Sequence, residues 1–304
     1  MISAKPLLPP VQFSLRDSES TLRPRPTEYR PRRKPVTVAA GFVCEDGVLL
    51  CADTKITTAI KTNESKIAEF VSDDQLCALT FVMSSGDLNF PRSAVNACFE
   101  YLSKTSFTTL TMEQVRNAAQ IPLAEFYREH IYPHPDRMPQ DVFQQLLLGI
   151  WLRGETALFE PHETLLMPVE KFECIGSGST IGKYLAGQFK KAGGYPKTLQ
   201  EAALLASCII ETCIEYDEHC GGEAEMVVMH NDGQIESIED SVLYPGREFM
   251  ESLQRHDWKL LRALATKIPT DEEIDSVLED HSQHVRAALE SRETTLNLLR
   301  EHRG

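Results

Sequence analysis

The chain has 304 residues, a formal net charge of −14 and a sequence pI near 5.1. Its 42% hydrophobic and 25% charged content is typical of a globular protein, and the length suits one large domain or two ordinary ones. The acidic balance argues against nucleic acid as a partner, and no apolar run reaches the ~20 residues of a membrane-spanning helix, so we expect no membrane partner either.

The first segment, residues 1–35, differs from the rest of the chain in composition. It is rich in Pro and Arg, has no amphipathic period, and residues 1–36 carry a net charge of +5 inside an otherwise acidic protein. Such composition predicts a disordered leader, a pro-segment or a mis-annotated start. It lacks the apolar core of a signal peptide, so we expect a cytoplasmic protein.

Strands are predicted from Val36 onward. The runs VTVAAGFVC (36–44) and GVLLCAD (47–53) are joined at Asp46-Gly47, a strong hairpin signal. Two more β-rich runs follow, KIAEFV (66–71) and LCALTFVM (76–83). Residues 91–104 and 112–131 then show the three- and four-residue apolar spacing of helices.

The second half repeats this order of elements. The predicted strands are 142–152, 156–161 and 172–178, the predicted helices are 179–194 and 199–216, and a hairpin is predicted over 223–238 with its turn at Asn231-Asp232-Gly233. We therefore predict one α+β domain over 36–245, in which two antiparallel sheets lie between helix pairs as a four-layer αββα sandwich. Residues 246–304 are predicted to form a helical C-terminal extension.

The eight cysteines bear on location and on cofactors. None forms a CxxC pair, and most lie in apolar segments, which indicates reduced thiols in a cytoplasmic protein. The histidines show no HExxH or Cys/His ligand spacing, so we predict no metal site and no cofactor.

Several residues capable of chemistry lie at element ends. Thr37 opens the first strand, Asp53 closes its partner, Lys66 opens the next strand, and a Gly-Ser-Gly-Ser turn that contains Ser177 joins a strand to a helix. Asp217 and Cys220-Gly221-Gly222 follow the later helix. Each feature alone is more often a cap, a loop or a solvated side chain than a catalytic group.

Together, from Val36 to about residue 240, these motifs resemble the proteasome β-type subunits, which are N-terminal nucleophile (Ntn) hydrolases, and in particular their bacterial proteasome-like homologues. The resemblance lies in Gly41 four residues after Thr37, the hairpin ending in Ala52-Asp53, KIAEF from Lys66, CIGSGSTIG around Ser177, and DEHCGG from Asp217. It implies the Ntn hydrolase fold, a threonine-type peptidase or amidohydrolase, a peptide or protein substrate, and self-assembly into a ring or other oligomer.

The resemblance also implies a mechanism. Thr37 would supply both the nucleophilic hydroxyl and, through a free α-amine, the general base. Lys66 would favour the ionised hydroxyl and Asp53 would hold the Lys66 ammonium. Ser177, Asp217 and Cys220 would orient the Thr37 amine. Gly86, in MSSGDLN, is the candidate for the backbone N–H of an oxyanion hole.

Two positions depart from the pattern of this family. Cys220 stands where the family has Ser, and sulfur is a weaker hydrogen-bond partner. Val36 stands where pro-segments usually end in Gly, which opposes self-cleavage before Thr37. Translation from a GTG codon at Val36 would remove this obstacle, because the protein would then begin Met-Thr and lose the Met to an aminopeptidase. Mapping the translation start tests this hypothesis.

Two other functions stay open on the sequence. One is a non-catalytic, proteasome-like structural subunit, which Val36 and the 35-residue extension favour. The other is an Ntn amidohydrolase that cleaves a small non-peptide amide with the same nucleophile. The presence of Thr37, Asp53, Lys66 and Ser177 together favours a hydrolase, because a structural subunit has no need for this set.

Overall fold

The computed structural model describes the central part of the chain. The described ranges are 37–57, 61–84, 88–130, 132–133, 146–162 and 164–238, with residues 275–276, 279, 282–283, 286–287 and 290. The chain divides into the units Met1–Arg33 and Lys34–Gly304, and the whole first unit lies outside the described residues. The predicted leader therefore stays a prediction. So does most of the 246–304 extension, although its described residues are helical and exposed.

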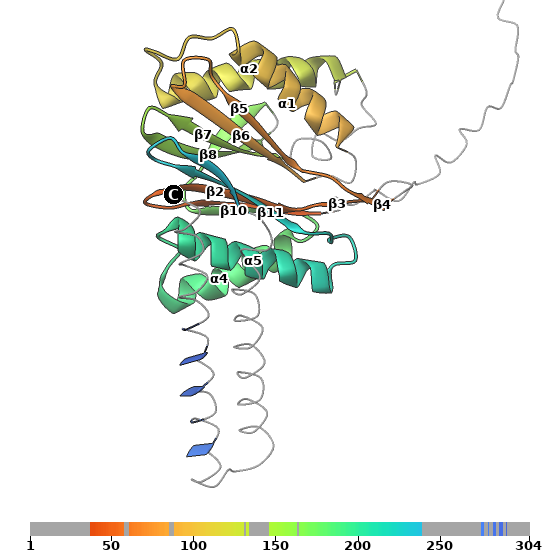
Figure 1. The fold of residues 1–304 in the computed structure, drawn as a ribbon. Coiled ribbons are helices and arrows are strands. Elements are labelled where there is room, and N and C mark those ends of the chain that lie inside the picture. Colours follow the sequence, from red (N-terminus) through yellow and green to blue (C-terminus); the bar gives the residue numbers. More distant parts are fainter. Residues whose placement is uncertain are drawn as a thin grey trace, which may run out of the picture. The chain divides into compact units, whose positions relative to one another are not determined.

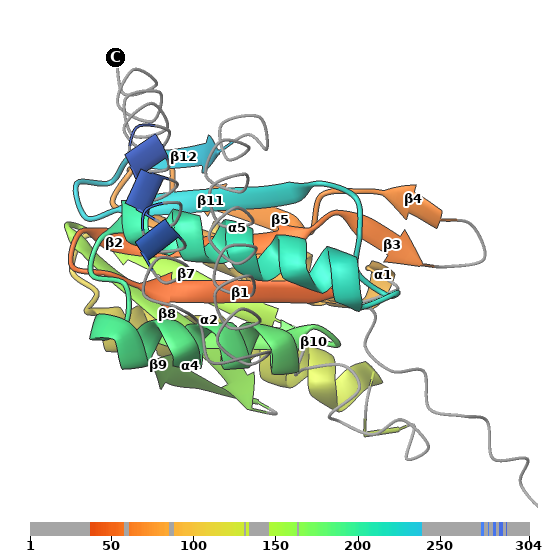
Figure 2. The same ribbon diagram turned by 90° about the horizontal axis from the view of Figure 1, so that it is seen from below.

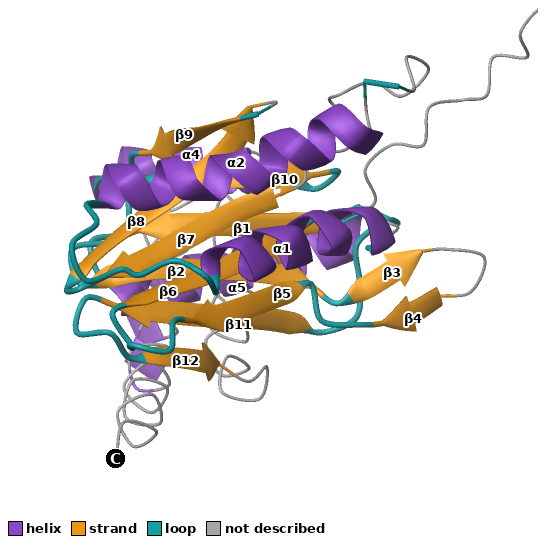
Figure 3. Cartoon of the chain, turned by 90° about the horizontal axis from the view of Figure 1, so that it is seen from above, coloured by secondary structure: helices purple, strands orange, loops and turns teal. Residues whose placement is uncertain are grey.

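Two five-stranded antiparallel sheets form the centre of the domain (Figures 1 and 3). The first sheet has the strand order β10 (Phe172–Gly176), β1 (Val38–Val43), β2 (Gly47–Asp53), β11 (Ala224–His230) and β12 (Ile235–Ile238). The second has the order β5 (Ile67–Val71), β6 (Cys77–Met83), β7 (Leu146–Leu152), β8 (Glu155–His162) and β9 (Leu165–Val169). A separate two-stranded sheet joins β3 (Lys55–Thr57) to β4 (Lys61–Asn63).

Two helix pairs cover these sheets. Helices α1 (Asn89–Leu102) and α2 (Met112–His130) pack on the second sheet, and helices α4 (Ser179–Gly193) and α5 (Leu199–Tyr216) pack on the first (Figure 1). Seen from below, α5 runs across β1, β2 and β11 (Figure 2). Among the described residues, no helix is both long and apolar enough to cross a membrane.

Three apolar clusters hold these elements together. One lies between α1, α2 and the second sheet, another between α4, α5 and the first sheet, and the third joins residues of both sheets, including Leu50, Val82, Leu147 and Met229. Each fully buried aliphatic or aromatic side chain stabilises the fold by about 1.5–3 kcal/mol. The third cluster fixes how one sheet lies on the other, and this decides which loop residues meet at the sheet ends.

The local sequence explains most of the observed elements. Gly47 begins β2 with a φ of 156°, and an added Cβ there would lie 2.2 Å from the carbonyl oxygen of Met229, so only glycine fits this hairpin. Thr198 caps α5 because its side chain accepts a hydrogen bond from the backbone N–H of Glu201. The α+β class and the order of strands and helices therefore agree with the prediction.

The structure contains strands that the sequence did not predict. Strand β9 contains Pro168, which lacks a backbone donor, and it lies at a sheet edge, where such a residue is tolerated. Strands β3 and β4 have three residues each, too few for an alternating pattern. Long-range pairing rather than local propensity creates these elements.

Candidate active site

Thr37, Asp53 and Lys66 come together although they belong to different elements. Thr37 precedes β1 and Asp53 ends the neighbouring β2, so the antiparallel pairing of these strands places them at the same sheet end. Lys66 directly precedes β5 of the second sheet. Its side chain therefore reaches Asp53 across the boundary between the two sheets. The contact between Lys66 and Asp53 depends on how the two sheets pack together.

The hydroxyl of Thr37 contacts both charged partners. It donates a hydrogen bond to Asp53 Oδ1 and accepts one from the Lys66 ammonium. Lys66 Nζ lies 2.7 Å from the same Asp53 oxygen. The side chains of Asp53 and Lys66 are fully buried, and Thr37 is also 0% exposed. A buried hydroxyl held between an acceptor and a cation has its oxygen fixed in place.

Backbone groups complete the surroundings of Asp53. Its Oδ1 accepts a hydrogen bond from the Val38 N–H at 3.1 Å, and its Oδ2 accepts one from the Gly221 N–H at 2.9 Å. These bonds offset the cost of burying a carboxylate. Burial lowers the pKa of Lys66 below its usual value, and the Asp53 carboxylate opposes this shift. The carboxylate thus helps to keep the ammonium charged.

Ser177 lies beside the backbone nitrogen of Thr37. The Thr37 N–H donates to Ser177 Oγ at 3.1 Å, and the Ser177 hydroxyl lies 3.2 Å from the Thr37 carbonyl oxygen. Ser177 also hydrogen-bonds to Asp217, the C-cap residue of α5. Burial raises the pKa of Asp217, but hydrogen bonds from Ser177, the His219 N–H and Cys220 outweigh burial and hold it below its usual value.

Cys220 lies next to Asp217, with Sγ 3.6 Å from Asp217 Oδ2. Its hydrogen-bond partner Cys213, burial, and the charges of Asp53 and Asp217 all raise the pKa of the Cys220 thiol. A thiol in this environment stays protonated, whereas a cysteine nucleophile needs a lowered pKa. The arrangement suits Cys220 as a hydrogen-bond donor rather than as a nucleophile.

The Gly-Ser-Gly-Ser turn is required by close packing around Thr37. Gly176 has a φ of 92°, and an added Cβ would lie 2.1 Å from the Thr37 carbonyl oxygen and 2.2 Å from Ser84 Oγ. Ser84 is fully buried, and its hydroxyl finds no hydrogen-bond partner within the described part of the chain. Gly86, the predicted oxyanion residue, lies outside the described residues, so that role stays a prediction.

One residue near the site was missed from the sequence. Glu225 on β11 accepts hydrogen bonds from Ser65 Oγ at 2.6 Å and from the Lys66 N–H at 3.1 Å. The signal was available, because Glu225 falls in the strand alternation with the buried Val227 and Met229. A carboxylate on that face needs a partner from the opposite sheet.

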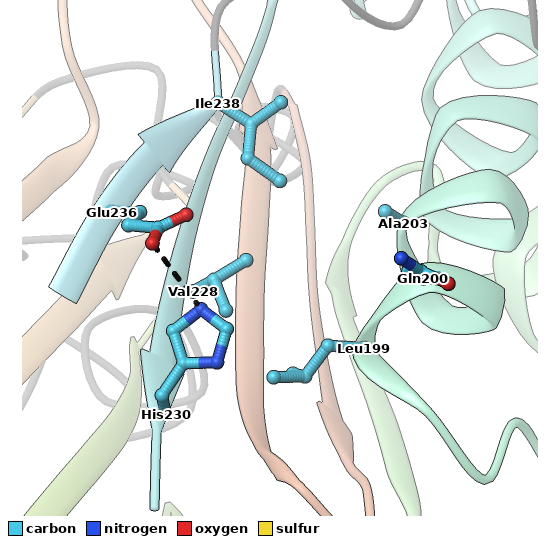
Figure 4. A pocket seen from close by; sticks show the side chains of 7 residues that line it. All are labelled: Leu199, Gln200, Ala203, Val228, His230, Glu236 and Ile238. Carbon is cyan, nitrogen blue, oxygen red and sulfur yellow. Dashed lines mark ion pairs between the residues drawn. The ribbon is translucent and has the colours of Figure 1, made fainter. Parts of the chain in front are cut away.

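A pocket lies away from Thr37, between the start of α5 and strands β11 and β12 (Figure 4). It is lined by Leu199, Gln200, Ala203, Val228, His230, Glu236 and Ile238. None of these residues belongs to the predicted site. His230 Nε2 points toward Glu236 at 3.7 Å. Among the described residues no cluster of His, Cys, Asp or Glu could hold a metal ion.

Comparison with known proteins places the fold among solved structures of Anbu. Anbu from Hyphomicrobium sp. strain MC1 is 16% identical, with a TM-score of 0.58, over 77% of this chain and 100% of its own. Anbu, described as the ancestral beta-subunit, from Yersinia bercovieri is 14% identical, with a TM-score of 0.59, over 77% and 99%. Anbu from Pseudomonas aeruginosa, solved as a helical assembly, is 18% identical, with a TM-score of 0.58, over 78% and 99%.

These comparisons correct the family assignment made from the sequence. No protein-family model and no curated protein matches the chain. The assignment to the proteasome β-type subunits is wrong, because the similar structures are Anbu proteins, which are proteasome-like but distinct. Motifs at the ends of strands and helices indicate a fold, and a fold alone does not identify the family. At 14–18% identity, the similarity to Anbu establishes a common fold.

Proposed function

We propose that this protein is a threonine-type amide hydrolase of the Ntn class, which cleaves peptide bonds with Thr37 as its nucleophile. The contact of the buried Thr37 hydroxyl with both Asp53 and Lys66 carries this proposal. A buried ion pair is costly unless it is well paired, so its presence around a hydroxyl favours a chemical role over a purely structural one.

In the proposed reaction the chain begins at Thr37. The free α-amine, with a pKa of about 7.7–8.0 in model peptides, takes the proton of the hydroxyl near neutral pH. The oxygen attacks the substrate carbonyl, the C–N bond breaks, and the amine product leaves with the proton that the α-amine had taken, which gives an acyl-enzyme ester on Thr37. Water then hydrolyses this ester, which releases the acid product and restores the Thr37 hydroxyl. The Lys66 ammonium stabilises the developing negative charge on the oxygen. Asp53 holds Lys66, and Ser177, Asp217 and Cys220 orient the amine.

The N-terminus decides whether this mechanism operates. As long as Val36 precedes Thr37, the Thr37 nitrogen is an amide and cannot act as a base. The first experiment is intact-mass measurement and N-terminal sequencing of the protein purified from its native host. A chain that starts at Thr37 supports the proposal, and a chain that keeps Val36 contradicts it.

Activity is then tested on the processed protein. We expect cleavage in a library of fluorogenic peptide amides, abolished by Thr37→Ala and reduced but retained by Thr37→Ser, which keeps the hydroxyl. If only small non-peptide amides are hydrolysed, the proposed substrate class changes from peptides to small amides, and Thr37 stays the proposed nucleophile. Full activity of Thr37→Ala would refute the assignment of the nucleophile.

A non-catalytic structural role is the second candidate, because Val36 opposes self-cleavage before Thr37. The two functions differ in the N-terminus they require, so the same mass measurement separates them.

Self-assembly and domain organisation are part of the proposal. The Pseudomonas aeruginosa Anbu was solved as a helical assembly, and we propose that this chain also forms a homo-oligomer. Electron microscopy of the purified protein tests this, with a monomer as the contrary outcome. We propose an Ntn-type αββα arrangement over 36–245, which the three apolar clusters support. Residues 1–35 as a leader and 246–304 as a helical extension remain proposals.

A further inference from the structure

We propose that Glu225 is a positioning residue, which fixes the backbone at Lys66 and so the position of the ammonium that acts on Thr37. The inference deepens the proposed hydrolase function and rests on it. Glu225 lies on β11, Lys66 precedes β5, and 159 positions in the sequence separate them. Glu225 therefore ties the first sheet to the start of the second at the site itself.

The position of Glu225 on its strand explains this role. Its Cα pairs with Ala52 of β2, one residue before Asp53. Both Ala52 and Met229, which shares a strand face with Glu225, belong to the cluster between the two sheets. Glu225 thus lies on the face of β11 that points to the second sheet, at the end of the strand where the apolar cluster borders the charged site. A hydrophobic residue there would leave the backbone N–H of Lys66 without this acceptor.

Both oxygens of the Glu225 carboxylate are engaged. Oε1 accepts the Ser65 hydroxyl at 2.6 Å, and Oε2 accepts the Lys66 N–H at 3.1 Å. The Ser65 hydroxyl also lies 3.1 Å from the Ile67 N–H. Two hydrogen bonds to one carboxylate restrict translation and rotation of this segment more than a single bond does. The Lys66 side chain therefore extends toward Asp53 from a backbone that is held in place.

Helix α1 also contacts this segment, through Arg92. Arg92 donates to the Ser65 carbonyl oxygen at 2.9 Å and forms an ion pair with Glu64 at 2.9 Å. The Arg92–Glu64 pair is about 40% exposed and is therefore weak. Glu225 is only half-buried but bonds directly to Lys66, so we expect it to contribute more to the position of the ammonium than Arg92 does.

The charge of Glu225 acts in the same direction as its hydrogen bonds. Burial lowers the pKa of Lys66, whereas the negative charges of Asp53 and Glu225 raise it. The charge of Glu225 also acts on Glu69 of β5: burial raises the pKa of Glu69, and the negative charge of Glu225 raises it further. Removing the charge of Glu225 should therefore lower the pKa of Lys66 further, so that the ammonium loses its proton at a lower pH.

The test compares Glu225→Gln with Glu223→Gln in the processed, full assembly. Glu223 is exposed, lies two residues away and loses the same charge, so it is a matched control. We expect Glu225→Gln to lower kcat/KM about tenfold, mainly through kcat, and to move the alkaline limb of the pH profile to lower pH. Glu225→Asp keeps the charge but shortens the side chain by one methylene group. It should therefore lower kcat/KM and leave the alkaline limb of the pH profile at the same pH.

A direct titration separates this inference from the proposed function. The ¹⁵N chemical shift of Lys66 Nζ, assigned with Lys66→Arg, reports its protonation whether or not the protein is active. We expect Glu225→Gln to lower the pKa of Lys66 and Glu223→Gln to leave it unchanged. If both variants leave the pKa of Lys66 and the rate unchanged, the inference about Glu225 is overturned. An inactive wild type with the expected titration would overturn the hydrolase instead.

Discussion

The buried pair of Lys66 and Asp53 predicts a large and specific loss of stability when the lysine is replaced. Lys66→Met keeps most of the side-chain volume but leaves the carboxylate of Asp53 without its cation, which lies 2.7 Å away and is fully buried. Removing one partner of a buried ion pair costs about 3–5 kcal/mol. Asp53 keeps hydrogen bonds from Val38 and Gly221, so we expect the lower end, about 3 kcal/mol.

The assay is urea unfolding at neutral pH, followed by far-UV circular dichroism. For a domain of this size, a loss of about 3 kcal/mol corresponds to a fall of about 6–12 °C in Tm. Lys104→Met is the control, because Lys104, just beyond the end of α1, and its partner Glu100 are 71% and 77% exposed. We expect that control to change the free energy of unfolding by less than about 0.5 kcal/mol.

A second variant distinguishes an unpaired charge from simple loss of packing. Asp53→Asn combined with Lys66→Met removes both charges, so the double variant should be about 1–2 kcal/mol more stable than Lys66→Met alone. The pH dependence has a definite sign as well. Because the pKa of Lys66 is lowered in the folded state, the unfolded state holds this proton up to a higher pH. Wild type should therefore gain stability relative to Lys66→Met as pH rises toward 10.5, the usual lysine value. A double variant no more stable than the single would refute the reasoning.

Three further predictions concern packing, buried thiols and the site. Gly178→Ala should lower the free energy of unfolding by about 1–3 kcal/mol, because the new methyl group would lie 2.8 Å from the Cβ of Val38. Gly187→Ala is the control on α4, since an added Cβ there meets nothing within 4 Å, and it should raise the free energy of unfolding by about 0.5–1 kcal/mol. Urea unfolding measures both. Burial raises the pKa of Cys51 from 9.0 to about 12, so the unfolded state loses this proton first and the free energy of unfolding should fall as pH rises through this range. The fall should be less steep in Cys51→Ala. Equal dependence of the unfolding free energy on pH in both proteins would contradict this. Cys220→Ser should raise kcat of the processed enzyme about 2- to 10-fold, because a hydroxyl is the stronger hydrogen-bond donor; a lower kcat would contradict this role.

Much of the fold could be predicted from the sequence, because its signals are local. The Asp46-Gly47 turn, the β-rich runs on either side of it and the helical spacing of 91–104 and 112–131 depend on neighbours only a few residues apart. Strand β9 could not be predicted in this way, since Pro168 weakens its local signal and only pairing with β8 makes it a strand.

The candidate site shows the same division. The sequence by itself determined which groups are available: Thr37, Asp53 and Ser177 stand at element ends whose turns are encoded nearby. The tertiary structure decided which groups meet, since Lys66 and Glu225 come from opposite sheets and reach one another only when the inter-sheet cluster forms. The physical reason is that turns and periodicity act over a few residues, whereas contacts between sheets depend on burying apolar surface from the whole chain.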